Sequence, residues 1–326
     1  MDGSVYDSEK VPSTWIWEDM GNYYGAGANA FTVHDNMFRI TFRSPTRPGE
    51  ETKIIATYPK IDGIHIQNKV LSSNVKRDLA YVYGSPLDKS REIRGTIPKN
   101  RSAFTIKAAV HHPEEVLAKL LVNEMAKQGI FITGKIKFET VAKENVQNIY
   151  IQSSPLLAEI IKVINYQSIN LFAEHLVRQI AYEKTGVGNR EKGIEVIQKY
   201  WNAKGLPAHT IFVEDGSGLS HFNAVSPKFF TGLLIKMKDT PAFINSLPPA
   251  GKGTLYQFDN TLLPDSTFYA KSGSMTRVRC YGGYIKADNG RVLAFSIMFN
   301  HFSGSHAKLI KEIEKLFVLF KEFVDE

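Results

Sequence analysis

The stretch TFYAKSGSMTRVRCYGGYIKADNGRVLAFSIMFN, residues 267 to 300, decides the fold of the second half of the chain. Its apolar residues fall into three short runs rich in aromatic and β-branched residues, a pattern typical of strands. Asp288-Asn289-Gly290 separates the second run from the third, and Asn-Gly between alternating apolar runs is the strongest short-range signal for a β-hairpin. The stretch therefore predicts antiparallel strands at residues 267–275, 279–287 and 291–300.

The residues on both sides of these strands predict helices. Downstream, apolar residues at helical spacing predict an amphipathic helix at the end of the chain: Leu309, Ile313, Leu316, Phe317, Phe320 and Phe323. Upstream, helices are predicted to begin at Pro113, at Ser154-Pro155, near Ser168, at Asn189 and at Ser226-Pro227. A short strand is predicted at TIFVE, residues 210 to 214. Residues 108–326 thus predict an α+β domain in which helices cover an antiparallel sheet.

The first third of the chain has a different pattern. AFTVHDNMFRITF, residues 30 to 42, predicts two alternating runs around a turn at His34-Asp35-Asn36. Further short strands are predicted at KIIATY, IHIQNKV, LAYVYG, EIRGTI and AFTIKAAV. Residues 1–107 therefore predict a β-rich accessory domain that precedes the α+β domain.

Composition excludes several classes of protein. The 326 residues are 43% hydrophobic and 22% charged, as in an ordinary globular protein. The net charge is +7, but 40 basic and 33 acidic residues are interspersed, so a nucleic-acid partner is not expected. Cys280 is the only cysteine and is predicted to be a buried, inert thiol. The nine histidines have no zinc-binding spacing.

Three short polar patterns in the second domain are candidates for a site. Ser168-Ile169-Asn170 falls in a break between two predicted helices, where Ser168 could simply cap the helix that follows. EDGSGLS begins at Glu214 and could be a plain turn, since it consists of turn residues. Lys271-Ser272-Gly273 lies in a predicted strand, where lysine could simply protect a sheet edge.

The order of the three patterns favours a shared function. Ser-x-Asn between helices, followed about a hundred residues later by Lys-Ser/Thr-Gly on a strand, is typical of serine enzymes that acylate on penicillin. The chain resembles the D-alanyl-D-alanine carboxypeptidase/endopeptidases known as low-molecular-mass class C penicillin-binding proteins. The resemblance also includes VPSTWIWEDMGNYYGAGANAF, IRGTIPKN, SSPLLAEIIKVINYQSINLFAEHLVRQI, DGSGLS, LPPAGKGTL and AKSGSM, in the order of that family.

The resemblance implies roles for individual residues. Ser168 would take part in the proton shuttle, and the Asn170 amide would hold the peptide group of the substrate. Lys271 would supply positive potential and help proton transfer. On the same strand Ser272 would bind the terminal carboxylate, Gly273 would let the substrate approach, and the backbone N–H of Ser274 would form half of an oxyanion hole.

Asp215 and Ser217 would shape the neighbouring loop. Ile169 stands where some members of the family have Asp, Ser272 replaces the commoner Thr, and His221 stands where the family often has Arg. The first two changes keep the groups that the roles need, whereas His221 leaves open which acidic group of the stem peptide is recognised there.

The family also requires a nucleophilic serine in a Ser-x-x-Lys helix, which lies upstream of the tryptophan-rich stretch where this chain starts. We therefore expect the N-terminal part that carries the nucleophile to be missing. Ser73-Asn74-Val75-Lys76 has the spacing but lies among predicted strands, and Lys184-Thr185-Gly186 ends a predicted helix.

The resemblance implies a serine-type DD-peptidase that acts on peptidoglycan stem peptides through an acyl-enzyme, binds β-lactams when intact and is periplasmic or otherwise exported. Two alternatives remain: a non-catalytic fragment that binds stem peptides, and a β-lactamase or esterase of the same superfamily. No apolar run is long enough for a membrane span, and no signal peptide is recognisable. Self-association is expected through residues 291–299, because no strand is available to cover that edge.

Overall fold

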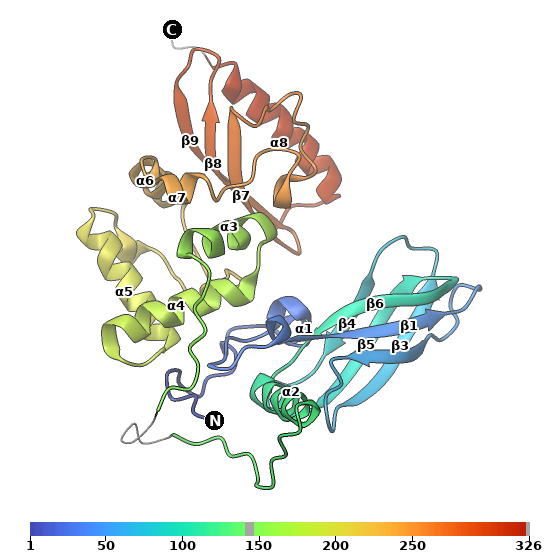
Figure 1. The fold of residues 1–326 in the computed structure, drawn as a ribbon. Helices are drawn as coiled ribbons and strands as arrows, with labels where there is room; N and C mark the ends of the chain where they lie inside the picture. The colour runs from blue at the N-terminus through green and yellow to red at the C-terminus, as the bar shows by residue number, and fades with distance from the viewer. Residues whose placement is uncertain (141–146, 324–326) are drawn as a thin grey trace. The chain divides into compact units, whose positions relative to one another are not determined.

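The computed structural model describes residues 1–140 and 147–323. The chain has an α+β fold with two compact units (Figure 1). The first unit comprises Met1–Asn148, Asn170–Val196 and Glu214–Asn223, and the second comprises Ile149–Ile169, Ile197–Val213 and Ala224–Glu326. The chain passes between the units several times, so neither unit is one continuous segment.

Two three-stranded sheets form most of the first unit. One has the order β2-β1-β6, with β1 Met37–Ser44, β2 Lys53–Tyr58 and β6 Arg101–Ala109. The other has the order β3-β5-β4, with β3 His65–Ser73, β4 Leu79–Tyr83 and β5 Ser90–Pro98. Both contribute alternate apolar residues to one core, including Phe38, Ile40, Val82, Ile93 and Ile97. The strands predicted at residues 53–58, 64–70, 79–84, 92–97 and 103–110 are confirmed.

All but the first of the helices described in the first unit begin near predicted positions, and the first was not predicted. They are α1 Trp17–Met20, α2 Pro113–Lys127, α4 Asn170–Thr185 and the first part of α5 Arg190–Ala203. Pro113 occupies the first turn of α2, and Gly129, with a left-handed φ of 77°, follows its end. The Asn189 side chain accepts the N–H of Lys192 at the start of α5.

The first of the two runs predicted in residues 30–42 is not a strand. A 3-10 turn, His34–Asn36, precedes β1, and all three of its residues have positive φ. The buried Asn36 side chain donates to the Gly27 carbonyl at 3.0 Å and accepts the Val33 N–H at 3.2 Å. These side-chain bonds hold the backbone in a turn where the apolar alternation predicted an extended strand.

The predicted antiparallel strands form the centre of the second unit. Its sheet has the order β7-β8-β9, with β7 Phe268–Met275, β8 Val278–Lys286 and β9 Val292–Asn300. Helix α8 His306–Lys321 covers one face, where Phe317 packs with Phe268, Tyr281 and Phe295 (Figure 1). The other face packs against α6 Pro227–Met237 and α7 Pro241–Ile244. Gly290 has a φ of 87° in the predicted hairpin turn.

Two predictions in the second unit are wrong. Helix α3 is Leu157–Gln167 and does not begin at Ser154-Pro155, because the Glu159 carboxylate accepts the Leu156 N–H and caps the helix there. The Ser154 hydroxyl instead donates to the Pro155 carbonyl. TIFVE is not a strand: it contains the end of a 3-10 turn, Ala208–Thr210, and a single bridge from Phe212 to Ala224.

The compact units do not coincide with the predicted division between residues 107 and 108. Helices α2 and α4 belong to the same unit as the β-rich region. The domain boundary therefore stays a prediction. Across residues 1–140 and 147–323, no helix has the length and apolar character needed to cross a membrane.

Candidate active site

Ser168 and Lys271 contact each other in the second unit. Ser168 follows the last residue of α3 with a left-handed φ of 55°, which is uncommon for a residue other than glycine. Lys271 lies in β7, and its Nζ donates to the Ser168 Oγ at 2.9 Å and to the Ser272 carbonyl at 2.5 Å. The break between α3 and α4 therefore presents the serine hydroxyl directly to the lysine amine.

The environment of Lys271 favours loss of its proton. Burial, with a smaller contribution from the nearby Arg279 charge, lowers the pKa of Lys271 to about 8. Desolvation disfavours the charged form of an amine, and a second cation adds to the effect. The amine is therefore a group that can both carry positive charge and exchange a proton with Ser168 near neutral pH.

The residues after Lys271 lie along a sheet edge. The Ala270 N–H points away from β8 and donates to the Pro248 carbonyl at 3.0 Å. Because backbone groups alternate along a strand, the N–H groups of Ser272 and Ser274 point to the same side. The Ser272 side chain is buried, on the opposite face of the sheet from Lys271, whereas Gly273 and Ser274 are exposed.

The packing of the protein itself does not require glycine at position 273. A Cβ there would meet only the Cys280 side chain, at an ordinary contact distance of 3.7 Å. A side chain at this position would instead cover part of the exposed strand. Cys280 is half-buried, and burial raises the pKa of its thiol.

Asn170 belongs to the first unit and is the first residue of α4. Its Nδ2 donates to the Tyr24 carbonyl at 2.9 Å. This bond fixes which side of the amide carries the donor, so the Asn170 Oδ1 is the acceptor left to face other groups. Tyr24 belongs to the tryptophan-rich stretch that was singled out in the sequence without a role.

Asp215 organises the loop that contains Ser217, also in the first unit. Its carboxylate is buried and accepts four hydrogen bonds, which come from Trp15 Nε1 at 2.8 Å, Gly218 N at 2.7 Å, Ser220 N at 2.6 Å and Asn223 Nδ2 at 2.9 Å. A carboxylate with this many donors fixes the turn of the loop. The role of Asp215 and Ser217 in a substrate site stays a prediction.

Sequence reasoning missed Trp15 and Glu174. Glu174 is 3% exposed and accepts the Ser217 N–H at 2.8 Å. Burial, followed by repulsion from Asp215, raises the pKa of Glu174 to about 7. A glutamate four residues after Asn170, on a helix face with apolar neighbours, was the available signal.

Serine-lysine pairs with three-residue spacing have structural roles in the described part of the chain. Ser73 ends β3 and is not on a helix, which agrees with its dismissal as a nucleophile. Ser305 and Lys308 have the same spacing and were not noticed in the sequence. The Ser305 hydroxyl caps α8 by accepting the Lys308 N–H. Lys184-Thr185-Gly186 ends α4, where Gly186 has a φ of 81°.

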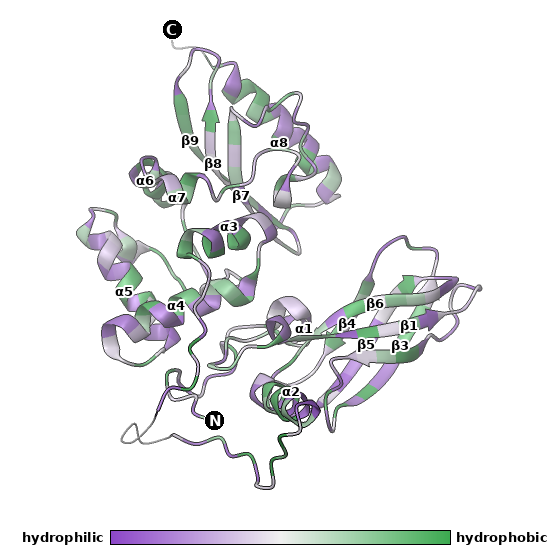
Figure 2. Ribbon diagram, in the orientation of Figure 1, coloured by the Kyte–Doolittle hydropathy of each residue, from purple (hydrophilic) through white to green (hydrophobic). Residues whose placement is uncertain are grey.

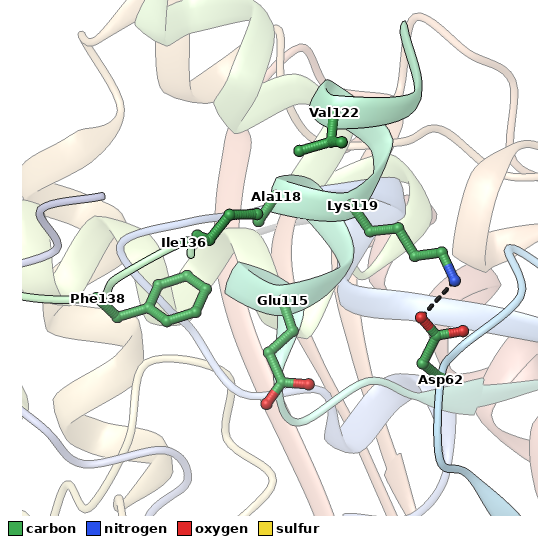
Figure 3. A pocket seen from close by; sticks show the side chains of 7 residues that line it. All are labelled: Asp62, Glu115, Ala118, Lys119, Val122, Ile136 and Phe138. Carbon is green, nitrogen blue, oxygen red and sulfur yellow. Dashed lines mark hydrogen bonds and ion pairs between the residues drawn. The ribbon is translucent and has the colours of Figure 1, made fainter. Parts of the chain in front are cut away.

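A hollow beside α2 contains none of the predicted site residues. It has a volume of about 330 Å³, with Ala118, Val122, Ile136 and Phe138 forming its apolar wall (Figure 3). Lys119 and Asp62 pair at its rim. Within residues 1–140 and 147–323, no cluster of His, Cys, Asp and Glu side chains is arranged to hold a metal ion.

A serine hydroxyl beside a lysine of lowered pKa, on an exposed strand edge, has the groups that exchange protons in serine-type acyl transfer. The model of the D-Ala-D-Ala carboxypeptidase 3 (S13) family matches residues 1–321. The chain therefore belongs to this peptidase family.

Curated relatives extend the comparison. The chain is 26% identical over 324 residues to a D-alanyl-D-alanine carboxypeptidase of Actinomadura sp., covering 93% of this chain and 59% of that protein. It is 23% identical over 313 residues to the D-alanyl-D-alanine carboxypeptidase DacB of Haemophilus influenzae, covering 93% of this chain and 64% of that protein. The chain thus spans about three fifths of the length of these relatives.

A solved structure shows the same fold. Penicillin-binding protein 4 (dacB) of Haemophilus influenzae superposes with a TM-score of 0.80 at 21% identity, covering 99% of this chain and 75% of that one. The same protein in complex with a novel β-lactam gives a TM-score of 0.71 at 20% identity, covering 90% of this chain and 70% of that one. This likeness extends the α+β assignment to nearly the whole chain.

Proposed function

We propose that the chain is part of a serine-type D-Ala-D-Ala carboxypeptidase/endopeptidase that acts on peptidoglycan stem peptides through an acyl-enzyme. The single observation that carries the proposal is the 2.9 Å contact between Lys271 Nζ and Ser168 Oγ at the edge of β7. A substrate in the cell wall implies a periplasmic or otherwise exported location. The proposal requires no metal and no cofactor.

In this proposal the edge of β7 receives the end of the stem peptide. The positive charge of Lys271 attracts the terminal carboxylate, and Ser272 binds it through its outward N–H, because the Ser272 side chain is buried on the opposite face. The outward N–H of Ser274 stabilises the oxyanion of the tetrahedral intermediate. Gly273 keeps the strand accessible. Asn170 holds the peptide group of the substrate. Asp215 and Ser217 shape the neighbouring loop.

Ser168 and Lys271 form the proton relay of the proposed reaction. When the nucleophilic serine attacks the peptide carbonyl, its proton passes through the Ser168 hydroxyl and the Lys271 amine to the leaving D-alanine nitrogen. The lowered pKa of Lys271 suits such an exchange, because proton transfer is efficient when the pKa lies near the working pH. In this proposal the nucleophilic serine itself belongs to a Ser-x-x-Lys helix upstream.

A second candidate is a non-catalytic module that binds stem peptides. It is favoured by the structural roles of Ser73 and Ser305, since neither is arranged as an activated nucleophile. Binding and catalysis share the β7 edge, so the two candidates differ only in whether an acyl-enzyme forms.

Titration of the chain with an N-acyl-D-Ala-D-Ala peptide tests the shared part of both candidates. We expect saturable binding that Lys271→Ala weakens at least about tenfold, the scale of a lost charge-assisted hydrogen bond. Lys315→Ala, on an exposed face of α8, is the matched control and should bind normally. Equal affinity in the Lys271→Ala variant would remove the basis of the proposal.

A further inference from the structure

Glu174 is a buried carboxylate that has no part in the proposed reaction. It lies in α4 four residues after Asn170, and residues at this spacing occupy the same face of a helix. Only 3% of its surface is exposed. A buried carboxylate is costly unless it is hydrogen-bonded, so its position requires an explanation.

Glu174 contacts the Ser217 loop through both the backbone and the Ser217 side chain. The Ser217 N–H donates to Oε1 at 2.8 Å. The preceding residue, Gly216, lies directly on α4: a Cβ there would be 2.5 Å from the Ala173 carbonyl oxygen and 2.7 Å from Val177 Cγ2. The loop therefore rests on the helix backbone, and Glu174 holds it at the point of closest approach.

Asp215 holds the other side of the same loop. Its bonds to the N–H groups of Gly218 and Ser220 set the turn, and its bond from Trp15 Nε1 ties the turn to the tryptophan-rich stretch. Two carboxylates thus clamp one short loop, Asp215 from within and Glu174 from the helix.

The cations near Glu174 are engaged elsewhere. Arg178, one turn further along α4, is bound by Asp7 and Glu9. Arg190 of α5 is bound by Glu9 and donates to the Glu214 carbonyl. Repulsion from Asp215 raises the pKa of Glu174, whereas the attraction between Glu174 and Arg190 contributes to the raised pKa of Arg190.

We propose that Glu174 is a positioning residue that fixes Ser217 against the face of α4 that carries Asn170. The inference rests on the proposed function in one respect only, which is that Ser217 and Asn170 share a substrate. The position of the loop itself follows from the Glu174 contact. Ionisation of Glu174 places a second negative charge beside Asp215. The environment of the Ser217 loop therefore changes with pH as long as residue 174 has a carboxyl group.

Two substitutions separate the hydrogen bond from the charge. Glu174→Gln keeps an oxygen that can accept the Ser217 N–H but cannot ionise, whereas Glu174→Ala removes both. Glu183→Gln is the matched control, since Glu183 is an exposed glutamate of the same helix that bonds to Gln179.

Nuclear magnetic resonance of the full chain monitors the loop through the signals of the Trp15 indole and the Ser217 amide. The indole signal of Trp15, one of three tryptophans and assigned with Trp15→Phe, should titrate with a midpoint near 7 in the unmodified chain and in Glu183→Gln. In Glu174→Gln the titration should vanish while the Ser217 amide stays protected. In Glu174→Ala that amide should exchange at least about tenfold faster, as expected for a lost hydrogen bond to a charged group.

A Trp15 signal that titrates equally in Glu174→Gln would overturn the inference. If Glu174→Ala does not fold, the comparison of the Trp15 titration in Glu174→Gln with that in the unmodified chain decides the role of Glu174. Binding of the N-acyl-D-Ala-D-Ala peptide is measured beside it and should weaken in Glu174→Ala but not in Glu174→Gln at pH 6. An unmodified chain that binds no peptide would contradict the proposed function, and the Trp15 and Ser217 signals would still decide the role of Glu174.

Discussion

At the scale of single residues, the Lys271–Ser168 contact leads to a kinetic prediction. Lys271→Ala in the full-length protein should slow acylation by a fluorescent penicillin by at least about 100-fold, the usual effect of losing a proton-transfer or electrostatic group. Stopped-flow fluorescence measures the rate. Stability should change little, because the cost of burying the Lys271 charge offsets the hydrogen bonds of its amine to Ser168 and to the Ser272 carbonyl.

The control for this prediction is Lys315→Ala, which removes an exposed lysine of α8 paired with Glu312. Its acylation rate should equal that of the unmodified protein. An unchanged rate in Lys271→Ala would show that the contact with Ser168 has no part in proton transfer.

The raised pKa of Glu174 predicts a pH dependence of stability. The group has a pKa of about 7 in the folded protein against 4.5 as its ordinary value, so the folded chain binds the proton more tightly. Stability from this group is therefore full below pH 4.5 and is lost as the pH rises to about 7. The shift corresponds to roughly 3 kcal/mol at most.

Glu174→Gln should remove this dependence, since glutamine does not titrate. Urea unfolding at pH 5 and pH 8 measures it, with Glu183→Gln as the control. We expect the free energy of unfolding of Glu174→Gln to exceed that of the control at pH 8 by more than at pH 5. A constant difference between the two variants would mean that Glu174 titrates normally.

Candidate site residues could be selected from the sequence where a short motif contains them. Ser168 and Lys271 stood out through spacing and residue type, and Asp215 through its turn-rich loop. Trp15 could not be assigned, because its partner Asp215 is 200 residues away and only the fold brings the two together. Glu174 was hidden by the same long-range contact, since its partner is the backbone of Ser217.

At the scale of elements, periodicity predicted strands well and element boundaries less well. The period-two pattern and Asn-Gly turn of residues 267–300 left one arrangement for β7, β8 and β9. Local side-chain bonds decided the failures: Asn36 folds its own backbone into a turn, and Glu159 caps α3 after Pro155. Such bonds compete with the pattern of apolar residues and leave little trace in it.

Two glycines provide a matched prediction at this scale. Gly216→Ala should destabilise the protein by about 1–3 kcal/mol, because its Cβ would overlap the backbone of α4. Gly273→Ala should cost less than about 1 kcal/mol, because its Cβ would make only an ordinary contact. Thermal unfolding of both variants measures the difference.

The functional effect of Gly273→Ala should nevertheless be large. The added methyl group would stand on the exposed strand where the stem peptide is proposed to bind, so affinity for the N-acyl-D-Ala-D-Ala peptide should fall. A Gly273→Ala variant that binds peptide normally would move the proposed binding strand elsewhere.

At the scale of the whole molecule, β9 is an exposed sheet edge. It pairs with β8 alone among the described strands, and the nine residues of Val292–Asn300 contain no charge and no proline. Hydropathy is high along most of the strand (Figure 2). Native proteins usually protect such edges with charges, prolines or a covering element, because an unprotected edge can pair with another chain.

Helix α3 has a related feature within the same unit. It is amphipathic, with Leu157, Ile160, Ile161 and Ile164 at helical spacing, yet none of its residues is fully buried. Leu156 and Leu157 are 73% and 57% exposed. Incompletely covered apolar surface on both a strand and a helix favours association with another segment or another copy.

We therefore expect the chain by itself to self-associate. It should not be acylated by penicillin, because neither Ser73 nor Ser305 is arranged as an activated nucleophile. Light scattering measures association, and intact-mass spectrometry after incubation with penicillin measures acylation. Val292→Lys, which places a charge on the exposed end of β9, should reduce association, whereas Leu319→Lys, at an equally exposed position of α8, should not.

If a segment with the family's Ser-x-x-Lys helix is supplied in trans and folds with the chain, both solubility and labelling should increase. A monodisperse chain that takes up one penicilloyl group unaided would contradict this prediction, and Ser73 and Ser305 would then be the first residues to test as nucleophiles.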